Sequence, residues 1–276
     1  MAYTKKSKEF YENRKKEIEG KLDKVLRESF TDAEKMRKLS LHFRITGLYN
    51  YSFINSILIA SQGGKLAQSF KAWKKLERHV KKGERSKIFI FIPYFKNVDE
   101  KNAITGKTET IKKLVGFGTG PVFDIDQTDG KPLEYDHNSE DVIDVDYTEL
   151  KVKVEKGFDV EITEKYTGSA RGYTDGKRIA ISEMSNNTDK VKTLVHELAH
   201  VVLEHCGKGR KARNVVEVEA EAATLFVESF LGYDVELSET YIANWKSSEI
   251  GRDSYKNVIR AADKIIKSLF IEKKAA

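Results

Sequence analysis

The segment TLVHELAHVVLEH, residues 193–205, places His196 and His200 four residues apart with Glu197 directly after the first histidine. Helical side chains at this spacing lie on one face, about 5–6 Å apart between Cβ atoms, so two imidazoles can converge on one ion. Glu197 is rotated by about 100° from His196, which suits a general base acting on water rather than a ligand. The pattern therefore predicts metal-assisted hydrolysis with Glu197 as the catalytic residue.

A third metal ligand must come from elsewhere in the chain. The segment RNVVEVEAEAATLFVESFLG, residues 213–232, follows a basic, glycine-containing connection and predicts a helix that returns beside the first. We expect Glu217 to be the third ligand and Glu221, four residues later, to orient a ligating histidine by hydrogen bonding. Glu219 is the alternative ligand. Two histidines and one carboxylate leave a fourth position open, which favours a single catalytic Zn²⁺ ion.

A further histidine, His205, stands nine residues after His196. On a continuous helix this separation is about 900° of rotation, which turns His205 to the far side of the helix. We therefore expect His205 to lie in the last helical turn before Gly207, near the negative end of the helix dipole, and not to bind the metal.

The elements that position these residues can be read from hydrophobic periodicity. The histidine-bearing helix has one apolar face, formed by Val191, Leu194, Val195, Leu198 and Val202. A strand, RIAIS at 178–182, precedes it, and an amphipathic helix is predicted at 254–270. Further helices are predicted at 5–28 and 33–61, the second broken near Gly47, and a short helix, a turn and the strand KIFIFIPYF follow.

Charge divides the chain into two halves. Residues 1–135 contain 28 Lys and Arg against 17 Asp and Glu, a net charge of +11, whereas residues 136–276 contain 21 against 26, a net charge of −5. We therefore expect two domains of α+β class, 1–135 and 145–276, joined through the acidic run EYDHNSEDVIDVDY. The basic half favours a polyanionic partner, either nucleic acid or an anionic membrane surface.

The basic half also carries aromatic residues among its cations, as a site for single strands requires. Residues 71–87 contain eight Lys and Arg against two Glu. The candidate phosphate contacts are Lys74, Lys75, Arg78, Lys81, Lys82 and Arg85, and the candidate stacking residues are Tyr49, Tyr51 and Trp73. Trp73 has two readings, because a tryptophan at this position can equally anchor the core.

The single cysteine, Cys206, excludes an internal disulfide in this sequence of 276 residues and favours a reducing compartment. No stretch reaches the roughly 18–20 apolar residues of a membrane span, and the first residues lack the apolar core of a signal peptide. We therefore expect a cytoplasmic location and no membrane association.

Residues 170–245 resemble the zincin metallopeptidase domains of the ImmA/IrrE and ArdC-like families, with a strand, HELAH, and a Glu-x-x-Ala-Glu helix ending in FLGYD. In these families the strand before the active helix lies beside the cleft. The resemblance assigns that position to Gly172, Tyr173 and residues 179–182, and implies that a peptide is the substrate.

Residues 45–130 are similar to the N-terminal domain of ArdC-like antirestriction proteins, through LYNYSFINSILIASQ, FKAWKKLERHVKKGERSKIFIFIP and VFDIDQT. This resemblance implies single-stranded DNA binding and a mobile-element role, in which incoming DNA is protected from restriction. Two other interpretations stay open. One is an ImmA-like zinc protease that cleaves a specific regulatory protein, and the other is a DNA-binding protein whose metal site is only structural.

Overall fold

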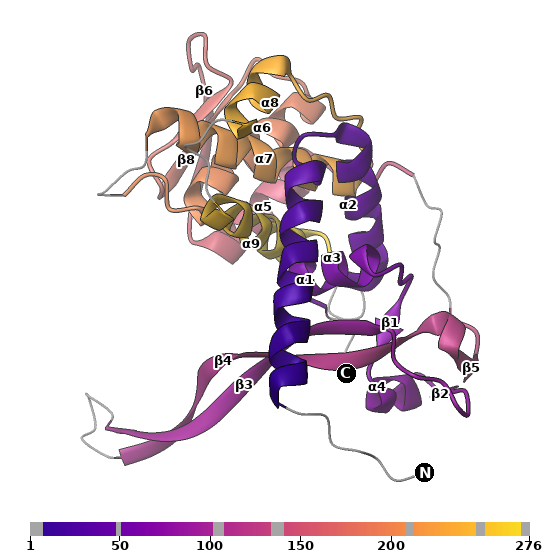
Figure 1. Cartoon of the computed structure of the whole chain (residues 1–276). Coiled ribbons are helices and arrows are strands. Elements are labelled where there is room, and N and C mark those ends of the chain that lie inside the picture. The colour runs from indigo at the N-terminus through magenta and orange to yellow at the C-terminus, as the bar shows by residue number, and fades with distance from the viewer. Residues whose placement is uncertain are drawn as a thin grey trace. The chain divides into compact units, whose positions relative to one another are not determined.

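The computed structural model describes residues 8–47, 51–101, 108–133, 141–207, 212–246 and 252–271. The chain forms two compact units of mixed helices and sheets (Figure 1). Unit 1 comprises Met1–Leu22 and Leu58–Leu133, and unit 2 comprises Asp23–Ile57 and Glu134–Ala276. The division after Leu133 lies close to the expected boundary. However, the expected continuous domain 1–135 is interrupted, because Asp23–Ile57 packs with the C-terminal half.

Aromatic side chains explain why this early segment belongs to unit 2. The ring of Phe53 lies 4.6 Å from that of Phe43 and 4.5 Å from that of Phe226 between centroids, with both pairs edge to face. The hydroxyls of Ser40 and Ser229 are 2.7 Å apart. These contacts join residues far apart in the sequence, which helical periodicity alone does not reveal.

Unit 1 is built around a long antiparallel hairpin of strands β3 and β4. Strand β1 pairs with the inner end of β4, and β2 pairs with β5 in a separate small ribbon. Helices α1 (Lys8–Ser29) and α3 (Phe53–Ser61) run across the division between the units. The remaining elements of unit 1 are β1 (Ala67–Gln68), α4 (Phe70–Lys75), β2 (Arg78–Val80), β3 (Ile88–Lys101), β4 (Thr108–Asp124), the 3-10 helix η1 (Ile125–Gln127) and β5 (Thr128–Gly130).

The outer part of the hairpin, residues 92–101 and 108–118, is called the arm below. Figure 1 shows it as a two-stranded ribbon that extends beyond the pairing of β1 with β4. The register shifts between Tyr94 and Phe95, because Tyr94 faces Gly116 and Phe95 faces Leu114. Val115 is thus the extra residue of a β-bulge, a feature that bends a strand and increases its twist.

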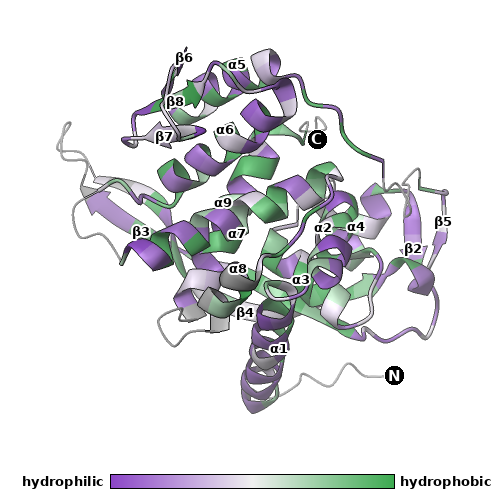
Figure 2. Ribbon diagram, turned by 90° about the horizontal axis from the view of Figure 1, so that it is seen from above, coloured by the Kyte–Doolittle hydropathy of each residue, from purple (hydrophilic) through white to green (hydrophobic). Residues whose placement is uncertain are grey.

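Unit 2 packs helices against a three-stranded sheet of order β6-β8-β7, in which β6 runs parallel and β7 antiparallel to β8. The central strand β8 buries Ile179, Ala180 and Ile181, and it is coloured as hydrophobic in Figure 2. The elements are α2 (Ala33–Gly47), α5 (Tyr147–Phe158), β6 (Glu161–Lys165), β7 (Gly172–Thr174), β8 (Arg178–Ser182), α6 (Asn187–Val202), α7 (Arg213–Leu231), α8 (Glu239–Lys246) and α9 (Arg252–Leu269).

Helix α6 carries the two histidines of the motif. It begins after Asn186, whose side chain accepts a hydrogen bond from the Asp189 N–H and so satisfies one of the free donors of the first turn. Val191, Leu194 and Leu198 are fully buried, so the apolar face expected from the sequence is confirmed except at Val202, which is only partly buried. Within the described ranges, no helix combines the length and the apolar character needed to cross a membrane.

Candidate functional site

The structure brings His196 and His200 of α6 together with Glu217 of α7. One nitrogen or oxygen of each side chain lies within 4.8 Å of the others. The two Nε2 atoms are 3.2 Å apart, and Glu217 Oε2 lies 3.6 Å from Nε2 of His200 and 3.9 Å from that of His196. The convergence expected from the four-residue spacing, and from a returning second helix, is therefore present.

The three donors differ in exposure. His200 is buried, whereas the side chain of Glu217 is 50% exposed. Burial, and then the neighbouring His196, lowers the pKa of His200 to about 4. His200 is therefore neutral near pH 7 and has a nitrogen lone pair available for a ligand. The neighbouring His196 lowers the pKa of Glu217, which keeps that carboxylate ionised.

Glu197 lies beside the cluster on the same helix. It is only 8% exposed, and this burial raises the pKa of its carboxyl to about 7. Burial acts in the opposite direction on His196, but the carboxylates of Glu217 and Glu197 outweigh it and raise the pKa of that imidazole. A carboxyl group that titrates near neutral pH can both take and return a proton there, as a general base and acid must.

The position of His205 differs from the one expected. Helix α6 ends at Val202, so the rotation of a continuous helix does not apply. Glu204 takes a left-handed conformation with φ 59°, and the His205 N–H donates to the His200 carbonyl oxygen at 3.0 Å. This turn folds the imidazole of His205 back, so that its Nδ1 lies 3.1 Å from Nδ1 of His200. His205 is buried and faces a proposed metal ligand rather than the far side of the helix.

Glu219, the alternative ligand, is fully buried and is not part of the three-residue cluster. Its Oε2 lies 3.1 Å from Nε2 of His205. Glu221 was expected to orient a ligating histidine, but no hydrogen bond joins it to a histidine among the described residues. Glu219 makes the contact instead, through His205, because residues two apart on a helix point in nearly opposite directions.

Strand β7 passes close to the catalytic candidate. A Cβ atom added at Gly172 would lie 2.6 Å from Thr193 Cγ2 and 3.4 Å from Glu197 Cγ, so only glycine fits between the strand and α6. β7 is an edge strand of its sheet, and the next residue, Tyr173, is half exposed. Strand β7 therefore lies directly beside α6, close to Glu197.

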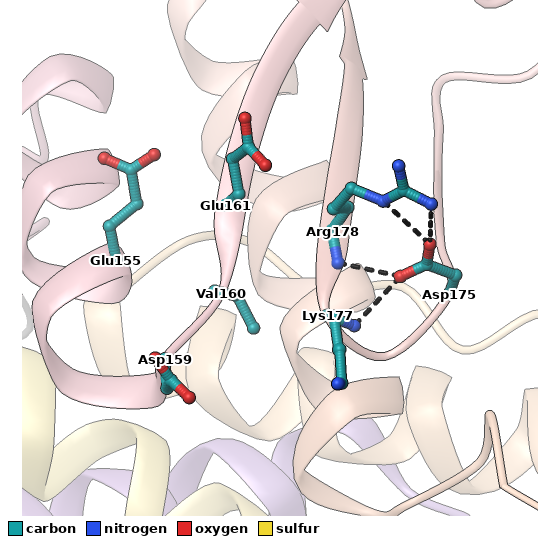
Figure 3. A pocket seen from close by; sticks show the side chains of 7 residues that line it. All are labelled: Glu155, Asp159, Val160, Glu161, Asp175, Lys177 and Arg178. Carbon is teal, nitrogen blue, oxygen red and sulfur yellow. Dashed lines mark hydrogen bonds and ion pairs between the residues drawn. The ribbon is translucent and has the colours of Figure 1, made fainter.

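Another part of unit 2 contains an open hollow of about 770 Å³ (Figure 3). Figure 3 shows that its Asp175 accepts hydrogen bonds from the backbone N–H groups of Lys177 and Arg178 and from the Arg178 guanidinium. The two backbone bonds contribute most to lowering the pKa of Asp175 to about 2. Asp175 therefore holds the turn between β7 and β8, and we assign no chemistry to the hollow. Its lining residues are Glu155, Asp159, Val160, Glu161, Asp175, Lys177 and Arg178.

Two of the three aromatic residues expected to stack on DNA bases, Tyr51 and Trp73, do not present a ring to solvent. Trp73 is completely buried, and its indole N–H donates to the Phe123 carbonyl oxygen at 2.8 Å. Tyr51 is 9% exposed, and Tyr49 lies outside the described residues. The core reading of Trp73 is therefore correct, and the stacking role expected for Tyr51 and Trp73 is wrong, because both rings are enclosed by neighbouring elements.

The expected cations have a mixed outcome. The Arg78 guanidinium donates hydrogen bonds to the Thr128 hydroxyl and to backbone carbonyl oxygens, including that of Lys131 at 2.6 Å. These bonds join β2 to β5. Lys81 is exposed and donates to the Asp126 carbonyl oxygen at 3.1 Å. The other four cations are all exposed, as a phosphate-facing surface requires: Lys74, Lys75, Lys82 and Arg85.

The arm contains exposed aromatic rings that the sequence analysis did not single out. Tyr94 is 54%, Phe95 56% and Phe117 51% exposed. A Cβ atom at Gly118 would lie 2.2 Å from the Tyr94 ring, so the hydroxyl end of that ring lies against the glycine while Tyr94 remains 54% exposed. The signal that could have revealed this platform is the alternation of Gly116, Gly118 and Gly120 opposite an aromatic strand.

Comparison with known proteins supports the N-terminal resemblance. Residues 8–123 match the family model of the N-terminal domain of anti-restriction factor ArdC, which confirms the ArdC-like reading of that region. Two crystal structures of antirestriction protein ArdC from the R388 plasmid, one metal-free and one Mn(II)-bound, are each 21% identical in sequence to this chain. Each alignment covers 78% of this chain and 81% of the ArdC chain, with TM-scores of 0.44 for the metal-free and 0.43 for the Mn(II)-bound structure. No curated protein matches the sequence.

Proposed function

We propose that unit 2 is a zinc-dependent, zincin-like peptide hydrolase, with Zn²⁺ held by His196, His200 and Glu217. The observation that carries this proposal is the convergence of three ligand atoms within 4.8 Å, beside a buried glutamate. Two imidazoles and one carboxylate form a donor set typical of catalytic zinc sites, in which a fourth position stays open. The half-exposed Glu217 leaves that position accessible to solvent.

The distances between the donors fit a metal ion. Tetrahedral ligands at about 2.0–2.1 Å from zinc are separated from one another by roughly 3.3 Å. The observed separations of 3.2, 3.6 and 3.9 Å bracket this value. A small inward movement of the exposed Glu217 side chain would complete the geometry, whereas the two histidines need no rearrangement.

In the proposed reaction, Glu197 takes a proton from the attacking water and returns it to the leaving amine of the peptide. A bound Zn²⁺ ion supplies a Lewis acid for the peptide carbonyl oxygen and lowers the pKa of water. The pKa of about 7 suits Glu197 to both transfers, because the carboxyl is then ionised and protonated in comparable amounts near neutral pH. Burial of Glu197 also strengthens its interaction with developing charge.

The edge strand β7 supports a peptide as the substrate class. An extended peptide can add to an exposed sheet edge through main-chain hydrogen bonds. Gly172 lets this edge approach α6 closely, near Glu197, and Tyr173 offers a half-exposed ring for a substrate side chain. We propose that β7 aligns the scissile bond beside the metal.

The test uses the full-length chain loaded with Zn²⁺, and mass spectrometry to detect cleavage of a peptide library. We expect Glu197→Gln to bind zinc like the wild type and to cleave about 10²–10⁴ times more slowly, since the amide cannot take a proton. Glu149→Gln, which removes an exposed carboxylate on α5, is the matched control and should cleave normally. Equal cleavage by Glu197→Gln and the wild type would refute the mechanism.

Two alternatives are separated by the same measurements. Zinc binding without any cleavage of the library favours either a structural metal site or a protease that recognises one regulatory protein. Loading with Mn²⁺ and Co²⁺ in parallel tests the choice of metal, because affinity alone does not make a site of this type selective. A structural site predicts that metal removal lowers the thermal midpoint of unfolding while Glu197→Gln changes no function.

We further propose that unit 1 binds single-stranded DNA, with the arm as its stacking surface. Single strands are held by cations along the phosphates and by aromatic faces on the bases. Tyr94 meets the second requirement, since its ring lies against Gly118 and the residue is more than half exposed. Lys96 faces Lys113 across the arm, two residues beyond Tyr94. The exposed Lys74, Lys75, Lys82 and Arg85 supply further cations.

DNA binding is tested by fluorescence anisotropy with single-stranded and duplex oligonucleotides at several salt concentrations. We expect tighter binding to the single strand, an affinity that falls with salt, and weaker binding by Tyr94→Ala. Exposed Tyr166 in unit 2 is the matched control, and Tyr166→Ala should bind as the wild type does. Absence of binding to either form would leave the protease that recognises a specific protein as the better reading.

Together, the two proposed activities and the ArdC resemblance support an antirestriction role during transfer of a mobile element. In a transfer assay, the protein should raise the entry of unmodified plasmid DNA into restricting recipients, but not into restriction-deficient ones. Tyr94→Ala and Glu197→Gln then show which activity protects the DNA. Equal transfer with and without the protein would rule out this role.

A further inference from the structure

Behind the proposed metal ligands lies a buried chain of three side chains. His200 Nδ1 is 3.1 Å from His205 Nδ1, and His205 Nε2 is 3.1 Å from Glu219 Oε2. His200 and His205 are 9% and 8% exposed, and Glu219 is not exposed at all. Each of the two contacts needs one proton between its heavy atoms, so the positions of the protons are linked.

The positions follow from the donor and acceptor properties of each group. When Glu219 is ionised, its carboxylate only accepts, and the proton that faces it is carried by His205 Nε2. A neutral imidazole has one N–H, so His205 Nδ1 has a lone pair and accepts the Nδ1–H of His200. His200 Nε2 is then left with a lone pair, and this is the atom that lies 3.2 Å from His196 Nε2 and 3.6 Å from Glu217 Oε2.

We propose that Glu219 and His205 are positioning residues that fix the ring orientation of His200 and the tautomer with a free Nε2, and thereby prepare it to bind the metal. This inference rests on the proposed function and extends it. Ligating histidines usually pass their second ring N–H to a carboxylate or a carbonyl oxygen. Here a second histidine stands between the ligand and the carboxylate.

The fold supplies the reasons for this arrangement. The left-handed Glu204 turns the chain directly after α6, so His205 lies beside His200 although five residues separate them. Glu219 lies on the buried face of α7, next to the completely buried Ala220. A buried carboxylate without a partner is strongly destabilising, so its pairing with His205 also fixes where α7 packs.

The first test determines the tautomers by long-range ¹H–¹⁵N correlation NMR on the full-length protein labelled at histidine, without metal and with one equivalent of Zn²⁺. We expect His200 protonated at Nδ1 and His205 protonated at Nε2, with zinc strongly shifting the Nε2 resonances of the ligands His200 and His196 but not the ring nitrogens of His205. A proton on His200 Nε2 in the metal-free protein, or a doubly protonated His205, would overturn the proposal.

The second test measures Zn²⁺ affinity by competition with a chromophoric chelator. Glu219→Ala removes the acceptor and should weaken zinc binding about 10–100-fold, the range found for outer partners of metal ligands. Glu219→Gln keeps an acceptor oxygen at the same place and should lose less affinity. Glu149→Gln, which removes an exposed carboxylate on α5, is the control and should bind zinc as the wild type does.

The outcomes separate this inference from the proposed function. If the wild type does not bind Zn²⁺, both fail. If the wild type binds and Glu219→Ala binds equally well, only the positioning role fails. If Glu219→Ala does not fold, the zinc affinity of Glu219→Gln and the histidine tautomers of the wild type still test the positioning role. A merely structural Glu219 would lower the unfolding midpoint in Glu219→Gln but leave the His200 tautomer and the zinc affinity unchanged.

Discussion

The metal-ligand cluster of unit 2 and the arm of unit 1 present their functional side chains in opposite ways. In unit 2, His200, His205 and Glu219 are buried and hold one another by hydrogen bonds. In unit 1, Tyr94 and Phe95 are more than half exposed, and Tyr94 rests on a glycine. Hydrogen bonds hold the side chains of the first region in place, whereas the second region presents aromatic rings to solvent.

This difference matches the two proposed chemistries. A metal site needs donors at defined distances, and buried polar groups need partners, so a network of hydrogen bonds provides both. A base can stack on any accessible aromatic face, and therefore needs exposure rather than fixed geometry. The comparison teaches that the side chains of the proposed metal site are mostly buried, whereas burial excludes a residue from the proposed DNA surface.

Substitution of a proposed metal ligand should distinguish the two regions most clearly, because it should affect only the metal-ligand cluster. We expect His196→Ala to lower zinc affinity by more than about a hundredfold, since a direct ligand contributes more than an outer partner. Its affinity for single-stranded DNA should stay unchanged. Zinc competition and fluorescence anisotropy on the same sample check both. A parallel loss of DNA binding would contradict the assignment of the two activities to separate regions.

Within unit 1, the buried and the exposed rings should behave differently. Trp73→Ala should destabilise the protein by about 3–5 kcal/mol, because it empties a filled core position. Tyr94→Ala should leave the free energy of unfolding nearly unchanged, since surface substitutions usually have small effects. Urea unfolding measures both variants. Similar destabilisation by the two would refute the distinction between core and surface rings.

The buried carboxyl of Glu197 makes the stability of the metal-free protein depend on pH. Its pKa rises from 4.5 to about 7 on folding, so the folded state binds more protons than the unfolded state between these values. The contribution of Glu197 to stability is full below about pH 4.5 and is lost as pH rises through 7. Above pH 7, the free energy of unfolding of metal-free Glu197→Gln should therefore be higher than that of the wild type, by up to about 3 kcal/mol.

His200 also makes stability depend on pH, but in the opposite direction. Its pKa is about 4 in the folded state, so it stabilises the fold increasingly as the pH rises above 4. Because this contribution is common to the wild type and the variant, their difference isolates Glu197. Urea unfolding from pH 4 to 8 measures it. A difference that does not grow with pH would show that Glu197 keeps an ordinary pKa.

The glycine platform of the arm can be tested by adding one methyl group. In Gly118→Ala the new Cβ would displace the Tyr94 ring, which can rotate away without disturbing the strand. We expect single-stranded DNA affinity to fall by up to about 1–3 kcal/mol, the range for one stacked base. Gly20→Ala is the matched control, because a Cβ there meets no atom within 4 Å. Unchanged binding by Gly118→Ala would exclude the platform.

The smallest expected effect belongs to the exposed lysines. Lys81→Ala/Lys82→Ala should weaken DNA binding only severalfold at low salt. The slope of log affinity against log salt should become shallower by about 0.7 for each phosphate that a lysine no longer neutralises. Titrations at several salt concentrations measure the slope. An unchanged slope would show that these lysines do not face the phosphates.

Sequence alone located the helix that carries the proposed metal ligands, because the apolar positions of residues 191–202 and the spacing of the two histidines repeat with the period of one helix. The alternation of charged residues in VEVEAEAA also contained unused information. Glu219 shares a helical face with Val215, Ala223 and Phe226, so its burial, and its need for a partner, could have been predicted.

Only the tertiary structure decided which residues meet across elements. The end of α6 at Val202 and the left-handed turn at Glu204 brought His205 back to His200, against the rotation that a continuous helix predicts. The enclosure of Trp73 and the exposure of Tyr94 likewise depend on neighbours distant in the sequence. Periodicity reports the faces of one element, whereas burial and partners are set by the packing of several.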